Sequence, residues 1–257
     1  MPILNICGGE QGGVGKSTVA GTILQYHIDH ELPFSAFDLD RSNADVKRRF
    51  GKVCDVHLAI LSEAQQHEDA ANALFNAALE QNVICNLPAQ VLPALNVWIE
   101  HNQLIELAVE TDVQLRIFHV AAPSFESRKL LSHSLNLFGD HIPHVLVKNL
   151  GMPGRWEQFE DEDLTELIEA YDLTVIEFPK FIGNSEKEFM DAQSMSYGEA
   201  LRHPDLGPIS KQRIKGFLRK AYDAFEDASL FTQKPKYVHE IVPFKRPSKG
   251  KDKEVQK

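Results

Sequence analysis

Cysteine is scarce in this chain. Three cysteines, Cys7, Cys54 and Cys85, are spread over 257 residues, which is too few and too scattered for a disulfide framework. Two of them sit in apolar runs that are typical of core strands, so no paired cysteines remain to hold an iron–sulfur cluster. We therefore exclude an iron–sulfur reductase and expect a reducing compartment.

Long hydrophobic runs are also missing. No apolar stretch approaches the roughly 20 residues that cross a bilayer, and the first residues do not form a basic-then-apolar leader. The chain shows no internal repeat. With 43% hydrophobic and 25% charged residues, it has the composition of a globular protein with one large core. We expect a soluble, cytoplasmic protein.

Positive charge is in deficit everywhere except at the carboxyl end. The formal net charge is −10, but residues 211–257 hold 13 Lys and Arg against 6 Asp and Glu, a net charge of +7. The first 210 residues carry 14 against 31, a net charge of −17. From about Thr232 the composition turns to Lys, Pro and Ser without periodicity. We therefore expect one domain over residues 1–230 and a basic, disordered tail over 231–257.

Apolar runs of strand length alternate with helical patterns along the domain. The predicted strands are residues 2–7, 34–40, 82–87, 113–120, 144–149 and 173–178. The predicted helices are residues 17–30, 63–80, 94–109, 126–138, 160–171, 185–193 and 208–228. This alternation predicts an α/β fold with a doubly wound, mostly parallel sheet and helices on both faces. Ligands of such sheets bind at the carboxyl ends of the strands.

A glycine-rich stretch, GGEQGGVGKST at residues 8–18, follows the first predicted strand. Its glycines let the backbone approach a phosphate, Lys16 can hold terminal phosphates, and Ser17 offers a hydroxyl to Mg²⁺ at the start of a helix. The predicted nucleotide-binding residues are Gln11, Gly12, Gly13, Val14, Gly15, Lys16, Ser17 and Thr18. The strict pattern GxxxxGK[ST] requires glycine where this chain has Glu10, so a glycine-rich turn without a ligand is the alternative.

Two carboxylates end the second predicted strand, in FDLDRSN. Asp38 and Asp40 stand at spacing i, i+2, which places both on the same side of an extended chain. Behind a phosphate loop, one carboxylate can hold the shell of Mg²⁺ and the other can orient an attacking water. We predict Lys16, Asp38 and Asp40 as catalytic residues and Ser17 and Asp40 as metal ligands. A solvated acidic turn is the alternative.

These motifs together resemble the ParA/MinD family of deviant Walker-box ATPases. The likeness rests on GGVGKST, the two aspartates, a third strand at NVICNLPAQ and a strand ending in Lys148 and Asn149. It covers residues 1–230 in order but is specific only in the first 50. The resemblance implies a P-loop NTPase fold, ATP and Mg²⁺ as ligands, and a homodimer that closes face to face around two ATP molecules. It also implies that Asp40 lies near the attacking water and that Asn149 meets the adenine.

Three positions depart from the family pattern. Gln11 replaces a signature lysine that reaches the partner's phosphates, and a neutral amide supplies no charge to the transition state. Glu10 brings a negative charge close to the phosphates, so its side chain must turn away. Asn86 replaces an aspartate that holds Mg²⁺ through water; it can still bind a water but adds no charge. These changes predict preserved ATP binding and slow hydrolysis.

A lysine elsewhere in the chain can substitute for the missing signature lysine. Carboxysome-positioning, McdA-type members of the family also lack it, and a lysine from the carboxyl-terminal half stands in for it there. Lys148, at the end of a predicted strand, is the candidate for this catalytic role, and Arg41 and Arg155 are weaker candidates. An ordinary exposed lysine at a strand end is the alternative.

The last predicted helix combines an apolar face with a basic one. The basic residues, our predicted DNA-binding set, are Lys211, Arg213, Lys215, Arg219 and Lys220. A basic end on an acidic body favours a polyanion partner, and the family binds the nucleoid nonspecifically through such helices. We expect nucleoid association; a core-docked helix with a solvated basic side is the alternative. Membrane binding is disfavoured because the apolar face is needed to close the fold.

Three functions remain open. The first is a positioning ATPase whose hydrolysis is stimulated by an adaptor protein on a cargo, a plasmid or a carboxysome. The second is a conjugation or mobilisation accessory of the TraL type, which RIKGFLRKAYDAF also resembles. The third is a nucleotide-binding module without hydrolysis, which Gln11 and Asn86 favour. His27 and His30 have no accompanying metal ligands and are expected on the surface.

Overall fold

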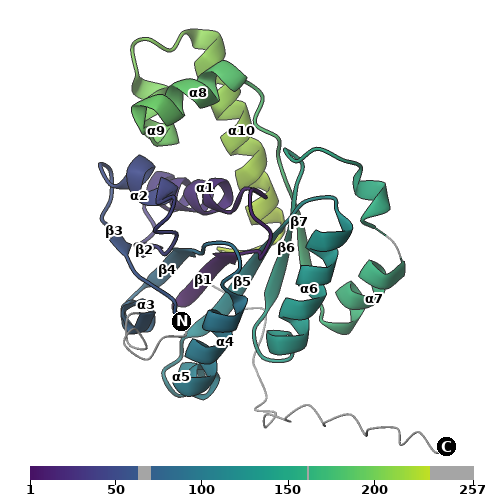
Figure 1. Cartoon of the computed structure of the whole chain (residues 1–257). Helices are drawn as coiled ribbons and strands as arrows, with labels where there is room; N and C mark the ends of the chain where they lie inside the picture. Colours follow the sequence, from purple (N-terminus) through teal and green to yellow (C-terminus); the bar gives the residue numbers. More distant parts are fainter. Residues whose placement is uncertain (63–70, 161, 232–257) are drawn as a thin grey trace, which may run out of the picture.

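A parallel sheet organises the chain in the computed structural model, which describes residues 1–62, 71–160 and 162–231 (Figure 1). Seven strands lie in the order β3-β2-β4-β1-β5-β6-β7, with all neighbouring pairs parallel. They are β1 (Ile3–Gly8), β2 (Phe34–Asp38), β3 (Val56–Leu58), β4 (Asn82–Asn86), β5 (Gln114–Ala121), β6 (His144–Asn149) and β7 (Thr174–Phe178). The predicted doubly wound sheet is confirmed. The direction of winding reverses at β1, where such sheets form their ligand crevice.

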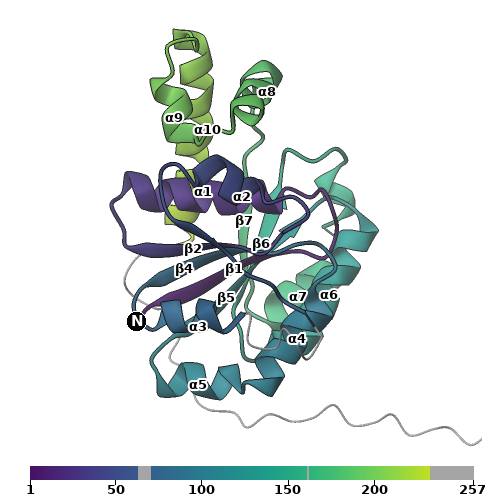
Figure 2. The same cartoon turned by 60° about the vertical axis from the view of Figure 1, so that its left-hand side comes forward.

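Helices cover both faces of the sheet. Figure 2 shows α1 and α2 on one face and α3, α4 and α5 on the other. The helices are α1 (Lys16–Asp29), α2 (Asp45–Phe50), α3 (Asn72–Ala78), α4 (Leu92–His101), α5 (Leu104–Glu110), α6 (Phe125–Phe138), α7 (Glu162–Ala170), α8 (Asn184–Gln193), α9 (Tyr197–Arg202) and α10 (Pro208–Asp227). Each βα unit therefore delivers a loop to the carboxyl ends of the strands, which we call the carboxyl edge.

Several predicted helix boundaries were wrong. The single helix predicted over 94–109 is two helices, because the chain turns at Gln103, whose φ of 48° is left-handed. The elements α2, α9 and β3 were not predicted, since runs of six or three residues are too short to show a period. Of the helix predicted over 63–80, the structure describes α3, and residues 63–70 lie outside the described part.

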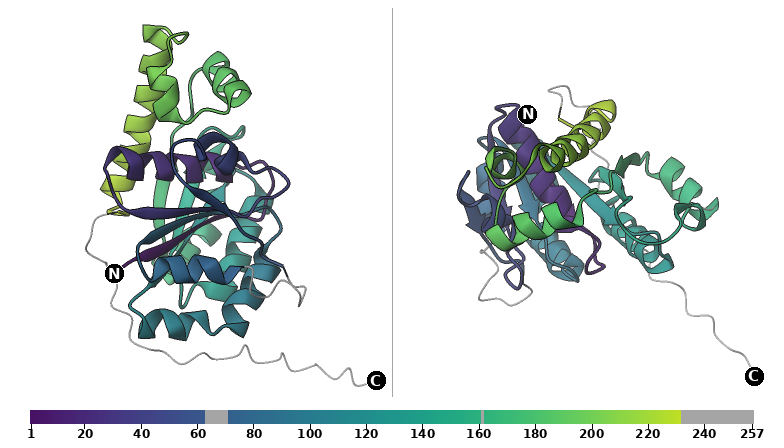
Figure 3. Two further views of the ribbon diagram at one scale, coloured as in Figure 1. Left: turned by 90° about the vertical axis from the view of Figure 1, so that its left-hand side faces the viewer. Right: turned by 90° about the horizontal axis from the view of Figure 1, so that it is seen from above.

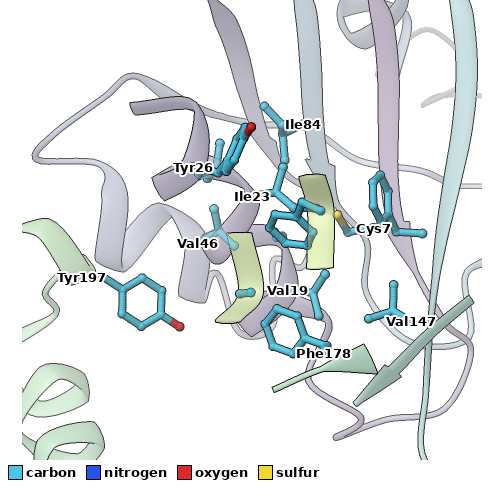
Figure 4. Packing of buried hydrophobic residues seen from close by; sticks show 14 of the residues in the cluster. Cys7, Val19, Ile23, Tyr26, Val46, Ile84, Val147, Phe178 and Tyr197 are labelled. Atoms are coloured by element: carbon cyan, nitrogen blue, oxygen red, sulfur yellow. The ribbon is translucent and has the colours of Figure 1, made fainter. Parts of the chain in front are cut away.

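The core on the α1 face is continuous from the sheet to α10. Figure 4 shows Val19 and Ile23 of α1 directed toward Ile84 and Phe178 of the sheet, all of them buried. His27 of α1 is also fully buried, so its expected surface position was wrong. Its ring lies against aromatic side chains, and Nδ1 is 2.9 Å from the carbonyl oxygen of Ile23. Burial lowers the pKa of this imidazole to about 4.

Helices α8, α9 and the first half of α10 stand beyond the rest of the molecule (Figure 3, left). We call residues 184–220 the arm and the remaining described residues the body. Two arginines of α2 fasten the arm, since Arg48 Nη1 donates to the Asp191 carbonyl at 2.6 Å and Arg49 Nε donates to the Met195 carbonyl at 3.0 Å. Helix α1 adds Gln25, whose Oε1 accepts from an arm amide at 2.9 Å.

The other end of α10 is fixed to the body. The Arg116 side chain of β5 donates to the Leu230 carbonyl, and the Phe231 ring lies 4.9 to 5.5 Å from the rings of Tyr26, His27 and Phe225. Of the predicted tail, residues 232–257 lie outside the described part. Among the described residues, no helix is long and apolar enough to cross a membrane.

Candidate nucleotide-binding site

The loop between β1 and α1, residues 9–15, is packed on its inner side and open on its outer side. A Cβ on Gly9 would lie 2.6 Å from the Val120 carbonyl, and one on Gly15 would lie 2.5 Å from the Asn149 amide nitrogen. Both residues also have positive φ, so backbone conformation and lack of space each require glycine at these positions. Gly12 and Gly13 are exposed, and a Cβ added at either would have nothing within 4 Å. Their backbone is accessible to an anion.

Lys16 opens α1 and turns back over this loop. Its side chain is buried, with 7% of the residue exposed, and Nζ donates to the Gln11 carbonyl at 2.9 Å. Burial lowers the pKa of this ammonium, while the charges of Asp40 and Glu10 act in the opposite direction. A lysine that rests on a backbone carbonyl can exchange that weak acceptor for a phosphate oxygen.

Three polar side chains from three elements meet behind Lys16. Asn86 Nδ2, at the end of β4, donates to Asp38 Oδ1 at 2.9 Å and lies 3.4 Å from Ser17 Oγ. Asp38 and Asn86 are fully buried. Burial raises the pKa of Asp38, although hydrogen bonds from Asn86 and from the Lys47 amide oppose the shift. The sheet order brings these residues together because β4 lies between β1 and β2.

This cluster offers the oxygen ligands that Mg²⁺ prefers. The side-chain oxygen of Asn86 is buried and accepts no hydrogen bond from any described residue, while the nitrogen of the same amide lies 3.4 Å from the Ser17 hydroxyl. A buried acceptor of this kind favours a cation or its bound water. The residues therefore fit a magnesium ion, because the Ser17 hydroxyl and the unsatisfied Asn86 oxygen belong to the same cluster.

Asp40 has surroundings different from those of Asp38. Strand β2 ends at Asp38, and Asp40 lies in the turn that follows, where its Oδ1 accepts from Ser42 Oγ at 2.6 Å and from the Asn43 amide at 3.1 Å. Asp40 is partly exposed. The two carboxylates thus do not share one side of an extended strand, and Asp40 is the one accessible to solvent.

Glu10 and Gln11 both turn toward neighbouring helices. Glu10 Oε1 accepts from the backbone amides of Val91 at 3.1 Å and Leu92 at 2.9 Å, at the start of α4. Gln11 Oε1 accepts from Ser124 Oγ at 3.3 Å, at the start of α6. The expectation that Glu10 points away from the phosphates agrees with this arrangement. Sequence patterns could not supply its partners, which lie 81 and 82 residues away.

Asn149, at the end of β6, is bonded to the inner side of the loop between β1 and α1. Its Nδ2 donates to the buried Val14 carbonyl at 2.7 Å, and its Oδ1 accepts from the Gly151 amide at 2.9 Å. The amide that we expected to meet adenine is thus bonded to the loop backbone. The contact with adenine stays a prediction.

Lys148 is engaged by two carboxylates. Nζ forms ion pairs with Glu160 and with Glu177, the latter at 3.0 Å, and lies 5.6 Å from the centre of the Trp156 ring. Burial alone would lower the pKa of Lys148, but the bonds and charges of both glutamates raise it. Lys148 is therefore not an ordinary exposed lysine. The weaker candidates, Arg41 and Arg155, are exposed.

The predicted DNA-binding residues lie on the arm. Lys215, Arg219 and Lys220 are exposed on α10, whereas Lys211 is partly buried. Arg213 is exposed but donates to Glu186 Oε1 at 2.9 Å, which joins α10 to α8. The apolar side chains predicted to form the inner face of the same helix are buried, whereas Ile209 near its start is 72% exposed; the buried ones are Ile214, Phe217, Leu218, Ala221 and Phe225.

Comparison with known proteins places the fold. No protein-family model matches the chain, and no curated protein matches it. The MinD cell division protein of Aquifex aeolicus is 12% identical over 96% of this chain and 100% of that chain, with a TM-score of 0.51. A nucleotide-binding protein of Archaeoglobus fulgidus, solved with ADP, is 14% identical over 79% and 90% of the two chains, with a TM-score of 0.48. The cell division ATPase MinD of Pyrococcus furiosus is 10% identical over 87% and 99%, also with 0.48. The likeness to the first of these shows a shared fold.

Proposed function

We propose that this chain is a ParA/MinD-like ATPase that binds ATP with Mg²⁺, hydrolyses it slowly, and positions or partitions a cargo on DNA. The observation that carries the proposal is the junction of Lys16, Ser17 and Asn86 at the open glycine loop on the carboxyl edge. A buried lysine, an accessible loop backbone and an unsatisfied oxygen suit a triphosphate with its cation. The fold shared with a MinD protein supports it.

Binding uses the open half of the loop. The exposed backbone of Gly12 and Gly13 and the amino end of α1 would receive the phosphates, since unpaired amides and the helix dipole favour anions. Lys16 would exchange the Gln11 carbonyl for a terminal phosphate oxygen. Val14, Gly15 and Thr18 shape the loop from within, and Asn149 holds it in place.

The residues that would hold the metal are Ser17, Asn86 and Asp40. Ser17 would ligate Mg²⁺ directly, and Asn86 and Asp40 would hold its waters. When bound, the ion neutralises charge on the outer phosphates. Asp38 then acts as a positioning residue, because its carboxylate accepts from Asn86 Nδ2 at 2.9 Å and so fixes the orientation of the Asn86 amide.

Hydrolysis needs a water to attack the terminal phosphorus while the bond to the bridging oxygen breaks and ADP leaves with that electron pair. Asp40, the accessible carboxylate, would orient the water, and Lys16 would stabilise negative charge on the transferred group. Gln11 adds no cation. For Lys148 to supply one in an ATP-bound homodimer, it must first leave Glu160 and Glu177. Slow turnover follows from both points.

The remaining parts of the proposal concern partners. Lys215, Arg219 and Lys220, with Lys211 and Arg213 beside them, would bind DNA phosphates without reading bases, which would place a cytoplasmic protein on the nucleoid. An adaptor protein on the cargo, a plasmid or a carboxysome, would stimulate hydrolysis. We do not propose membrane binding, because the apolar face of α10 is buried.

The test combines three measurements on the purified full-length chain. Titration calorimetry with ATP, with and without Mg²⁺, measures affinity; light scattering with a slowly hydrolysed ATP analogue measures dimerisation; and fluorescence anisotropy with a random duplex measures DNA binding. We expect Mg²⁺-dependent ATP binding, an ATP-dependent dimer and salt-sensitive DNA binding. A chain without affinity for any adenine or guanine triphosphate would contradict the proposal.

A nucleotide-binding module without hydrolysis is the second candidate. Gln11 and the engaged Lys148 favour it, because each leaves the reacting phosphate with less positive charge. Asn86 favours it because a neutral amide holds Mg²⁺ more weakly than a carboxylate does. Phosphate release above background, stimulated by DNA or by an adaptor, excludes this candidate. DNA retention that is independent of ATP would instead favour the TraL-type accessory.

A further inference from the structure

Glu10 joins the phosphate loop to the segment that follows β4. Its carboxylate accepts from the amides of Val91 and Leu92, and its backbone carbonyl accepts from the Gln90 amide at 3.2 Å. The Leu87 amide in turn donates to the Cys7 carbonyl at 2.9 Å. Residues 87–92 are therefore bonded to the strand and loop of the nucleotide site at several points along their length.

The chemistry at the start of α4 explains why a carboxylate is stable there. The first amides of a helix lack partners within the helix, and the helix dipole places partial positive charge on them. The cap residue, Val91, has no side-chain oxygen of its own with which to satisfy them. Glu10 supplies that oxygen, and α4 offsets a negative charge that would otherwise face the phosphates.

The same short segment has a second link to the nucleotide site. It begins directly after Asn86, whose amide lies beside Ser17 and is bonded to Asp38. Next to Glu10 in the sequence, the Gln11 carbonyl accepts the hydrogen bond that Lys16 donates in this structure. A ligand that draws Lys16 to phosphate removes a hydrogen bond next to Glu10. Residues 87–92 thus contact both the cation side and the phosphate side of the site.

The loop, although packed on its inner side, has a small void there. A cavity of about 20 Å³ lies beneath it, lined by Gly9, Glu10, Val91, Leu92 and His119 among others. This is space for about one water molecule. The contact between Glu10 and α4 is therefore a pair of directed hydrogen bonds beside a small void.

We propose that Glu10 is a positioning residue that couples occupancy of the phosphate loop to the start of α4, an inference that rests on the proposed nucleotide binding. The loop begins to move when Lys16 leaves the Gln11 carbonyl, and the Glu10 carboxylate transmits that movement to residues 90–95. Glutamate at a position where the loop pattern asks for glycine then has a role in communication.

Hydrogen exchange measured by mass spectrometry tests the coupling, with a slowly hydrolysed ATP analogue and Mg²⁺ at saturation. In the natural chain we expect exchange in residues 90–95 to change by about threefold or more when nucleotide binds. Glu10→Gly removes the carboxylate and restores the pattern's glycine. It should still bind nucleotide and still show protection of residues 9–18, but lose the change in residues 90–95.

Two further variants keep the test decisive. Glu10→Gln retains an acceptor without the charge, so it should keep part of the change, and it replaces Glu10→Gly if that variant does not fold. Glu126→Gln, which removes an exposed carboxylate from the first turn of α6, should behave as the natural chain. A cap that serves only stability would lower the basal protection of α4 in Glu10→Gly but leave the nucleotide-induced change intact.

The outcomes separate the coupling from the proposed function. Protection of residues 9–18 without any change in residues 90–95 of the natural chain overturns the coupling alone. An undiminished change in Glu10→Gly overturns it as well. Absence of measurable nucleotide binding by the natural chain overturns the proposed function, and the coupling with it.

Discussion

The phosphate loop and the arm both present cations, but the fold holds them in opposite ways. Lys16 is a single buried ammonium, which is bonded to a loop carbonyl and precedes Ser17 at the start of α1. On the arm, Lys215, Arg219 and Lys220 form an exposed group on one helix. Both arrangements suit phosphate, yet only the first fixes its geometry.

This difference teaches what each region can recognise. A buried cation in a preformed loop binds strongly where the ligand matches the cradle, because the desolvation of both charges must be offset by directed bonds. An exposed basic face attracts any polyanion, and salt screens the attraction. We therefore expect specificity in the body and general, salt-dependent binding on the arm.

Acid should damage the body far more than the arm. Three buried histidines lie in the body, and burial lowers the pKa of His27 and His144 to about 4 and that of His119 to about 3. Below pH 6.5 the unfolded chain binds protons that the folded chain does not. The free energy of unfolding should thus fall by roughly 1.4 kcal/mol per pH unit for each histidine down to about pH 4.

Urea unfolding between pH 7.5 and 5 measures this loss. His27→Phe suits the aromatic surroundings and should reduce the slope of unfolding free energy against pH by roughly 1.4 kcal/mol per pH unit, the contribution of one buried histidine. Substitution of the exposed His101 should leave the slope unchanged. Equal stability at pH 7.5 and 5 would show that these rings take up protons in the folded state.

Lys16→Ala should abolish most nucleotide binding without affecting the arm. Removing a charge-assisted contact to phosphate is expected to weaken affinity by about 100-fold, or roughly 2.7 kcal/mol. Calorimetry with ATP and Mg²⁺ measures the loss, and Lys129→Ala, on the exposed side of α6, is the control. DNA binding without nucleotide should be unchanged. Equal loss of affinity in both lysine variants would show that the overall charge of the protein, rather than the loop at residues 9–15 and Lys16, holds the nucleotide.

Asn86→Asp tests how the body tolerates a second carboxylate. The new group would lie where the Asn86 amide is now 2.9 Å from Asp38 Oδ1, so two buried carboxylates would repel each other. We expect the free energy of unfolding at pH 7.5 to fall by roughly 2 kcal/mol without ligand. ATP with Mg²⁺ should recover much of this loss, because the ion neutralises the pair.

The control for that variant is Asn82→Asp, at the opposite end of the same strand. Its stability should not respond more to ATP and Mg²⁺ than that of the natural chain. If the two variants gained equally from the ligand, a magnesium site at Asn86 would be contradicted.

A double substitution on the arm, Lys215→Ala with Lys220→Ala, should have the smallest effect on the folded chain. Loss of two phosphate contacts should lower the slope of log affinity against log salt by about 2, and weaken DNA binding by about tenfold at moderate salt. Anisotropy over a salt series measures both quantities. Lys52→Ala with Lys129→Ala, two exposed body residues, should leave the slope unchanged; an equal drop would remove the distinction between the regions.

Much of the fold could be predicted because its signals are local. The apolar runs of strand length and the glycine loop each depend on a few adjacent residues, and all six predicted strands are present within two residues. Short elements such as α2 and α9 are too short to show a hydrophobic periodicity. The break between α4 and α5 occurs at Gln103, without the glycine or proline that usually indicates a turn. The burial of His27 also depends on packing between distant segments.

At the site, residue types could be predicted but their partners could not. Lys16, Ser17 and Asn86 lie together because the strand order makes β1 and β4 neighbours. The capping of α4 by Glu10 and the capture of Lys148 by Glu160 and Glu177 are contacts between segments that sequence spacing does not relate. The divided surroundings of Asp38 and Asp40 follow from β2 ending earlier than predicted.

Helix α10 runs from the arm to the point where Phe231 is anchored. Its 20 residues span about 30 Å, which is the length of about nine base pairs of duplex DNA. The basic side chains lie between Lys211 and Lys220, and Asp223, Glu226 and Asp227 follow them. Residues 221–231 hold these three acidic side chains and no Lys or Arg, so a duplex lying along α10 would be attracted on the arm and repelled beyond it. Affinity should therefore stop rising once a duplex is long enough to cover the basic residues of α10.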